Sequence, residues 1–309
     1  MPPPAIIRWL ETVKQIGLVG CGRWGSLILR DLRALGCEVY VVARTDASRA
    51  VAAEGGAAAT VDTTAELPEI AGVVVATPVA THAAVIEEAF AHGVPVFVEK
   101  PLTDDPGAAE QLASTHDGRL FVMDKWRYHA GVEQLGAIAR SGELGRVIGL
   151  RTTRIGQERP RDVDAVWVLA PHDLSIALEI LGEVPAPRSA AADSVDGRAF
   201  GLFGLLGESP WHVLEVSGRA DERRREVVLA CEAGLAVLPE SYSDAVRIVR
   251  TDGSADELRP VSGELPLLRE LRTFVEHLGG GPPPRSSAAE GAAIVRTISE
   301  LRLLAGLQA

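Results

Sequence analysis

Short apolar runs that alternate with amphipathic stretches fill residues 1–124. Apolar, β-branched runs indicate strands covered on both faces, and apolar positions three and four residues apart indicate helices. The predicted strands are 14–19, 38–43, 73–76, 96–98 and 120–123, and the predicted helices are 24–35, 46–54 and 81–92. Strands that alternate with helices predict an α/β domain built on a doubly wound parallel sheet with right-handed crossovers.

The pattern changes in residues 125–309, where short alternating strands follow one another without helices between them. The predicted strands are 146–155, 199–206, 212–218, 226–231, 235–238 and 245–249, and the predicted helices are 132–141, 267–278 and 288–305. This succession predicts an α+β domain with a largely antiparallel open sheet. The mixed-sign run 222–226 is predicted to be a charged hairpin.

A further helix is predicted in the apolar stretch that ends at Gly182, because glycine favours the C-cap conformation. Pro171 suits the first turn of this helix, or a kink between two shorter helices. His172 is therefore expected near a helix start.

Three glycines between the first predicted strand and helix keep the G-x-G-x-x-G spacing. Gly20 allows a tight turn, Gly22 lets a pyrophosphate approach the backbone, and Gly25 lets the helix pack closely on the strand. Arg23 and Trp24 begin the helix that would face the pyrophosphate. Because the motif is short, a glycine-rich turn without a ligand is the alternative. In its α/β context it predicts a Rossmann dinucleotide-binding domain over 1–124.

Arg44 and Thr45 follow the second strand, where NAD-binding sites usually place an acidic residue for the ribose hydroxyls. An arginine there can instead pair with a 2′-phosphate. The alternative is a solvated surface arginine. We therefore expect NADP(H) rather than NAD(H) as cofactor.

Composition narrows the possible partners. The chain has 309 residues, 47% of them hydrophobic, and a net charge of −11, which disfavours nonspecific binding to nucleic acid or anionic membrane. No apolar run approaches the length of a membrane span, and no metal site is indicated. Three scattered cysteines suit a reducing cytoplasm. Residues 1–13 read as an extension before the first strand.

The motifs that follow the strands resemble the Gfo/Idh/MocA oxidoreductases, the family of glucose–fructose oxidoreductase and inositol dehydrogenase. The resemblance rests on the spans 20–25, 76–78 with 81–82, 98–102, 141–145 and 171–174. It implies cofactor contacts from Thr77, Pro78, His82, Glu99 and Pro101. It also implies a homo-oligomer formed through the sheet of residues 125–309, which is expected to be a substrate and oligomerisation domain.

Lys100 and His172 are the expected catalytic and substrate-binding residues. A lysine at the carboxyl end of a strand can donate a hydrogen bond to a substrate oxygen and stabilise an alkoxide; the alternative is an ion pair with Glu99. Imidazole suits proton transfer near neutral pH, although a lone histidine is more often structural. The resemblance implies that His172 is the acid or base and that Lys100 also contacts the cofactor.

Val168 departs from the family pattern, because many members carry an aspartate four residues before this histidine. Residues four apart share a helix face, so that aspartate would lie beside the histidine or the substrate. Three outcomes stay open. His172 works with Lys100 alone, Asp164 or Asp173 substitutes, or the catalysis is altered or absent.

Two further groups are candidate contacts. Arg127 is a candidate contact of the cofactor, Tyr128 is a candidate contact of the substrate, and Trp126 could stack on a ligand. The alternative is packing for Trp126 and Tyr128 and a surface salt bridge for Arg127. Arg154 belongs to a basic cluster that fits an anionic substrate group or, alternatively, a solvated loop. The cluster is made of Arg151, Arg154, Arg159 and Arg161.

The expected function is an NAD(P)-dependent oxidoreductase that transfers hydride to or from a sugar-like secondary alcohol or ketone. The basic cluster suggests a nucleotide-linked or acidic sugar. A dinucleotide-sensing regulator of the same family without catalysis, and a reductase of a non-sugar carbonyl, are the alternatives.

Overall fold

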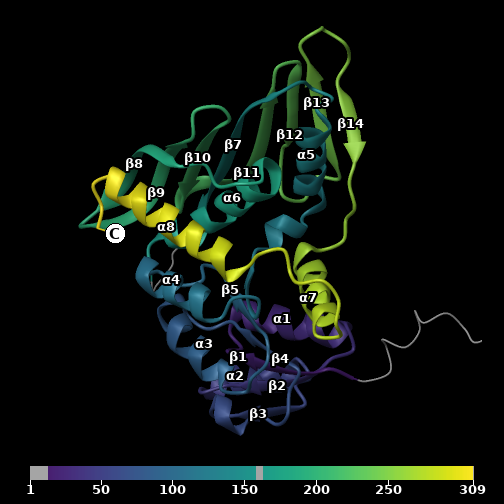
Figure 1. The fold of residues 1–309 in the computed structure, drawn as a ribbon, viewed down its shortest axis with the longest axis vertical. Helices are drawn as coiled ribbons and strands as arrows, with labels where there is room; N and C mark the ends of the chain where they lie inside the picture. The colour runs from purple at the N-terminus through teal and green to yellow at the C-terminus, as the bar shows by residue number, and fades with distance from the viewer. Residues whose placement is uncertain (1–12, 158–162, 309) are drawn as a thin grey trace, which may run out of the picture.

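Two β-sheets organise the protein. Its structure, a computed structural model, describes residues 13–157 and 163–308. In Figure 1 the first sheet lies toward the bottom of the view and the second toward the top, with helices between and beside them. None of the helices in these two ranges combines the length and the apolar character needed to cross a bilayer.

The first sheet has six parallel strands in the order β3-β2-β1-β4-β5-β6. The strands are β1 (Gln15–Val19), β2 (Glu38–Val42), β3 (Ala59–Val61), β4 (Gly72–Val75), β5 (Val96–Glu99) and β6 (Leu120–Met123). The helices that accompany them are α1 (Arg23–Ala34), α2 (Asp46–Glu54), α3 (His82–Phe90) and α4 (Pro106–Thr115). Every residue of β4 and β6 is buried, as expected for strands covered on both faces. The predicted doubly wound α/β fold is confirmed.

The strand order reverses between β1 and β4, because the chain builds outward to β3 on one side and to β6 on the other. In such sheets the residues beyond the carboxyl ends of the strands at the switch point form the ligand site. The turns after β1, β4 and β5 carry the glycine motif, Thr77 and Lys100, so the fold brings the predicted site residues to one edge.

The second sheet has eight strands in the order β14-β13-β12-β11-β7-β10-β9-β8. The strands are β7 (Val147–Gln157), β8 (Pro187–Val195), β9 (Arg198–Leu206), β10 (Trp211–Ser217), β11 (Arg219–Cys231), β12 (Gly234–Leu238), β13 (Ala245–Arg250) and β14 (Glu257–Pro260). All neighbours are antiparallel except β7 and β10, which confirms a largely antiparallel sheet. Helices α5 (Ala130–Ser141) and α6 (Ala165–Leu181) contribute to the core on its inner face.

The prediction of a hairpin over 222–226 is wrong. The run lies inside β11, where Arg224 pairs with Ile155 and Glu226 with Thr153 of β7. A register shift between Arg219 and Arg224 absorbs the extra residues. Charged side chains suit this part of the strand because most of it is exposed.

The two C-terminal helices pack across both sheets. On α7 (Pro266–His277), the Phe274 ring stacks on Phe97 of β5 at 4.9 Å. On α8 (Ala288–Leu304), Ile298 and Leu301 join a core cluster that includes Leu214 of β10. Figure 1 shows α7 beside α1 and α8 running past α4 and α6. Because these contacts cross residue 124, the division into 1–124 and 125–309 stays a prediction.

Candidate active site

The glycine motif forms an open cradle between β1 and α1. Gly20 has a φ of +93°, and a Cβ there would lie 2.7 Å from the carbonyl oxygen of Ala76. A Cβ on Gly25 would overlap the carbonyl oxygen of Gly20. Gly22 is the N-cap of α1, makes no side-chain cap and has open space where a Cβ would point. The first N–H groups of α1 are thus left for an anion, which fits the pyrophosphate of a dinucleotide.

Arg44 and Thr45 lie beyond the end of β2. The Arg44 guanidinium is mostly exposed and lies 3.7 Å from the carboxylate of Glu88. Thr45 is the N-cap of α2, where its hydroxyl accepts from the backbone N–H of Ser48. Because its ion pair is long and exposed, Arg44 is able to turn toward a phosphate.

His82 joins the loops that follow β4 and β5. The ring is buried, and its two nitrogens lie 2.9 Å from the carbonyl oxygens of Pro101 and Thr77. Burial lowers the pKa of His82, while these carbonyls oppose the shift. The structure therefore places His82 as a brace between two site loops, with Pro101 following a cis peptide bond.

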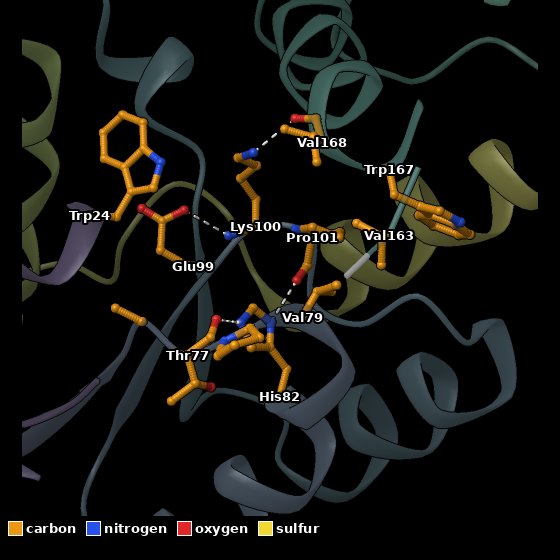
Figure 2. Close-up of a pocket in the computed structure, with 12 residues that line it drawn as sticks. Trp24, Thr77, Val79, His82, Glu99, Lys100, Pro101, Val163, Trp167 and Val168 are labelled. Atoms are coloured by element: carbon orange, nitrogen blue, oxygen red, sulfur yellow. Dashed lines mark hydrogen bonds between the residues drawn. The ribbon is translucent and has the colours of Figure 1, made fainter. Parts of the chain in front are cut away.

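Lys100 projects into the cleft from the end of β5. Its ammonium group donates a 2.9 Å hydrogen bond to the main-chain carbonyl of Val168 on α6, and its backbone N–H donates to the Glu99 carboxylate (Figure 2). Burial lowers the pKa of Lys100 to about 8, although the charge of Glu99 opposes the shift. The lysine is thus held between the first sheet and α6.

The prediction that His172 lies near a helix start is wrong. One continuous helix, α6, runs from Ala165 to Leu181, and Pro171 lies inside it. His172 is therefore more than one turn into the helix, on the same face as Val168 four residues earlier. Gly182 is the left-handed C-cap, as predicted.

His172 is buried among cations. The side chain is 9% exposed, and its Nδ1 atom has no hydrogen-bond partner among the described residues. Burial holds the pKa of His172 well below its ordinary value, and the charges of Lys100 and Arg154 lower it further. The lowered pKa leaves the imidazole of His172 neutral near pH 7, with a ring nitrogen that can accept a hydrogen bond or a proton, and also makes it a weak base.

Neither nearby aspartate is free to replace the missing carboxylate. Asp164 is the N-cap of α6 and forms a buried ion pair with Arg302 of α8. Asp173 pairs with Arg154 at 2.6 Å, and this pair is also buried. Both carboxylates hold α6 in place, which favours the alternative in which His172 works with Lys100 alone.

A cavity of about 250 Å³ adjoins Lys100. Its lining residues come from the loops after β4 and β5, from α1 and from the start of α6. They are Trp24, Ala76, Thr77, Pro78, Val79, His82, Glu99, Lys100, Pro101, Val163, Trp167 and Val168. The structure thus gathers seven of the predicted site residues in one place: Trp24, Thr77, Pro78, His82, Glu99, Lys100 and Pro101. His172 lies one turn beyond Val168, outside this lining.

Three predicted contacts are not in the cavity, because other residues occupy their polar groups. Arg127 donates to Glu179 and Glu290. Tyr128 is buried, and its hydroxyl accepts from the backbone N–H of Arg285. Arg154 is buried on Asp173, with its guanidinium 4.4 Å from the centre of the Trp126 ring. For Arg127 and Tyr128 the structural alternatives are the better interpretation, whereas Arg154 lies buried in β7 and not in a solvated loop, which is its alternative.

The two described members of the basic cluster, Arg151 and Arg154, do not line the cavity. Arg151 is exposed on β7 and pairs with Glu226. Arg159 and Arg161 lie outside the described residues. Within the described ranges, no group of three or more His, Cys, Asp or Glu side chains is placed to hold a metal ion.

Sequence reasoning named Val168 but missed the rest of the apolar side of the cavity and the buried carboxyl group of Glu270. Val163 precedes the helix cap Asp164 and Val168 is the fourth residue after it, which are the two apolar positions of a hydrophobic staple. This sequence pattern could have identified both residues. The Lys125 ammonium lies 4.0 Å from the centre of the Trp24 ring. Glu270 of α7 is buried without a hydrogen-bond partner among the described residues, and burial holds its pKa well above the ordinary value.

Comparison with known proteins agrees with this geometry. A family model described as an oxidoreductase family with an NAD-binding Rossmann fold matches residues 14–120. Inositol 2-dehydrogenase 1 of Paenarthrobacter aurescens is 32% identical over 147 residues, which are 44% of this chain and 44% of that protein. Inositol 2-dehydrogenase of Streptomyces avermitilis is 27% identical over 255 residues, 75% of this chain and 74% of that protein.

A third relative is known in sequence and structure. UDP-N-acetylglucosamine 3-dehydrogenase of Acidithiobacillus ferrooxidans is 31% identical over 193 residues, 60% of this chain and 57% of that protein. This match and the Paenarthrobacter match span about half the length of those relatives. The structure of the Acidithiobacillus enzyme superimposes with a TM-score of 0.82 at 22% identity, covering 95% of this chain and 98% of that chain.

The fold extends to more distant proteins. Levoglucosan dehydrogenase in complex with NADH superimposes with a TM-score of 0.85 at 15% identity, covering 96% of this chain and 97% of that chain. At such low identity the likeness shows the fold alone. The family model, which is that of the Gfo/Idh/MocA oxidoreductases, covers strands β1 to β5 of the first sheet and the helices α1 to α4, and the likeness beyond residue 120 rests on the sequence relatives and the shared fold.

Proposed function

We propose that the protein is a nicotinamide-dependent oxidoreductase that moves a hydride to or from a secondary alcohol carbon of a sugar-like substrate. The observation that carries this proposal is the position of Lys100. Its ammonium group lies beside a cavity at the carboxyl ends of β4 and β5, next to the glycine cradle, and is fixed on the carbonyl of Val168.

The cofactor is held by the edge of the first sheet. The cradle of Gly20, Gly22 and Gly25 takes the pyrophosphate, with Arg23 and Trp24 at the start of α1. The loops of Thr77, Pro78, Glu99 and Pro101 continue this surface to the cavity. The bound nicotinamide supplies or accepts the hydride.

The protein residues stabilise the charge on the substrate oxygen and transfer its proton. In the oxidising direction, the substrate hydroxyl accepts a hydrogen bond from the Lys100 ammonium, which stabilises the developing alkoxide. The hydroxyl proton passes to His172, which is neutral because its pKa is lowered. The carbinol hydrogen leaves as a hydride, and a ketone remains. In the reducing direction, His172 returns the proton.

NADP(H) is the proposed cofactor. An arginine directly beyond β2 provides a guanidinium for a 2′-phosphate, and Arg44 has only a long, exposed ion pair to give up. The family description and the levoglucosan dehydrogenase complex concern NAD(H), whereas the proposal of NADP(H) rests on Arg44 of this chain.

The substrate class rests on the relatives and on the cavity. The named relatives act on inositol and on a UDP-linked amino sugar. The cavity of about 250 Å³ is lined in part by the proposed cofactor contacts Thr77, Pro78 and Glu99, so only part of it is left for the substrate, which suits a small ring. A cytoplasmic location, expected from the cysteine content, stays a prediction.

Oligomer formation through the second sheet completes the proposal. Phe203 and Leu205 of β9 and Leu235 of β12 are exposed on its outer face, while α5, α6 and α8 cover the inner one. An exposed apolar sheet face is typical of a subunit interface.

The direct test is turnover. The purified protein is incubated with NAD⁺ or NADP⁺ and a panel of inositols and sugars, and in reverse with the corresponding ketones, while the absorbance of the reduced cofactor is followed. We expect turnover of at least one polyol. Tight cofactor binding without turnover on any substrate would instead favour a regulator, and turnover of non-sugar carbonyls alone would favour a different reductase.

A further inference from the structure

The cavity beside Lys100 has two different sides. One side carries polar groups from the first sheet, which include Lys100 and Glu99. The opposite side is built by the start of α6 and the residue before its cap, and presents the side chains of Val163, Trp167 and Val168 (Figure 2). We refer to these three side chains as the apolar wall.

The apolar wall has no charged group to offer a ligand. The one ionisable side chain in residues 163–168 is Asp164, which caps α6 and pairs with Arg302. Arg302 also lies over the Trp167 ring, at 5.8 Å from its centre. Both charges are therefore occupied in holding the wall.

The wall stands directly beside the reacting position. Lys100 donates to the carbonyl of Val168, so its ammonium lies next to this residue. A substrate oxygen bound by Lys100 brings the neighbouring substrate carbon close to the Val168 side chain. The substituent on that carbon decides the fit. A hydroxyl turned toward the side chains of Val163 and Val168 loses water without gaining a hydrogen bond from them, whereas a C–H or methyl group buries apolar surface.

We infer that the substrate is a deoxy sugar or deoxy cyclitol, whose carbon next to the reacting carbinol presents C–H or methyl to Val163, Trp167 and Val168. This inference rests on the proposed oxidoreductase function and names its substrate class. The discrimination expected of such a wall is about tenfold to a hundredfold in kcat/KM.

The test compares substrates that differ by one hydroxyl. The probes are myo-inositol with its monodeoxy derivatives, and D-glucose with its 2-, 3-, 4- and 6-deoxy forms. We expect at least one deoxy compound to exceed its parent about tenfold in kcat/KM. Val168→Thr replaces a methyl with a hydroxyl of similar shape, and should reduce this ratio about fivefold or more by giving the parent hydroxyl a partner.

Val163→Thr should act in the same direction, and Val51→Thr on α2, away from the cavity, is the matched control. Parents preferred over every deoxy form, or a ratio unmoved by both wall variants, would overturn the inference while leaving the oxidoreductase function intact. Saturation-transfer NMR with reduced cofactor present separates the two claims. Preferential binding of a deoxy compound that Val168→Thr removes would support the wall even if no substrate turned over, in which case the proposed function fails.

Discussion

At the scale of single residues, Lys100 and His172 have pKa values that move in the same direction for related reasons. Burial lowers both, and each lies in the field of other cations. The result is a neutral imidazole and a protonated lysine over a common pH interval. This pair of protonation states is the one that alcohol oxidation needs, because one group accepts a proton and the other stabilises negative charge.

The pH dependence of kcat/KM follows from these shifts. Above about pH 8 Lys100 loses its proton, so the rate of alcohol oxidation should fall about tenfold per pH unit. On the acid side, His172 stays neutral well below its ordinary pKa of 6.5. The rate of alcohol oxidation should therefore still be constant at pH 6.5 and fall only at lower pH. Initial rates measured between pH 5 and 10 check this profile. A rate that is still constant at pH 10 would contradict the role of Lys100.

Arg44 should determine the preference between cofactors. Replacing it by alanine removes the guanidinium proposed to pair with the 2′-phosphate, a charge-assisted contact. We expect the KM for NADP⁺ to rise about tenfold to a hundredfold and that for NAD⁺ to stay unchanged. Exposed Arg49, one turn along α2, provides a matched alanine control. Equal effects on both cofactors, or a native preference for NAD⁺, would refute the assignment.

The sequence predicted a residue's place in the site only where the backbone fold alone determines that place. Thr77 and Lys100 follow adjacent parallel strands, so the sheet alone brings them together. Arg127, Tyr128 and Arg154 depend on side-chain partners elsewhere in the chain. Tyr128, for example, is bound by Arg285, 157 residues away, and a local pattern does not reveal such a pairing.

At the scale of elements, α6 carries His172 and binds Lys100 through the carbonyl of Val168, and so joins the two proposed catalytic residues. The sequence pattern favoured a helix start near Pro171, because proline removes a backbone donor from a helix interior. In the structure the helix continues through Pro171, with 13 of its 17 residues buried. Burial against α5, α8 and the second sheet outweighs the local cost, which a single-sequence pattern does not contain.

The start of α6 depends on the buried pair of Asp164 and Arg302. Arg302→Met leaves the Asp164 carboxylate buried without its partner and should lower the free energy of unfolding by about 3–5 kcal/mol. Denaturant unfolding measures this loss. Adding Asp164→Asn should restore about 1 kcal/mol or more, because an amide still caps the helix without an unpaired charge. A double variant less stable than Arg302→Met would contradict this account.

At the scale of the whole molecule, the order of strands and helices predicted both sheets. The sequence pattern did not show that the C-terminal helices pack back on the first sheet. Four elements were not predicted, namely β3, β8, β14 and α4; β3 has three residues and α4 buries only Ala109 and Leu112. The contacts of α7 with the first sheet join positions far apart in sequence, such as Phe274 and Phe97. Periodicity predicts elements, but it does not predict which faces meet.

The outer face of the second sheet should form the oligomer. Phe203→Asp places a charge at the centre of the exposed apolar surface of β9 and should dissociate the assembly, because a buried unpaired charge is costly. Sedimentation over a range of protein concentrations measures the mass. Val51→Asp, an equivalent change on α2, should leave the mass unaltered. A native protein that sediments as a monomer at all concentrations would overturn this proposal.

The measurement that tests the central claim most directly is cofactor-dependent turnover by the native protein and by Lys100→Met, with Lys14→Met as control. The account predicts turnover of a polyol by the native protein and the control, a fall of about a hundredfold or more in Lys100→Met, and cofactor binding that is retained in all three proteins. Undiminished turnover by Lys100→Met would contradict the account.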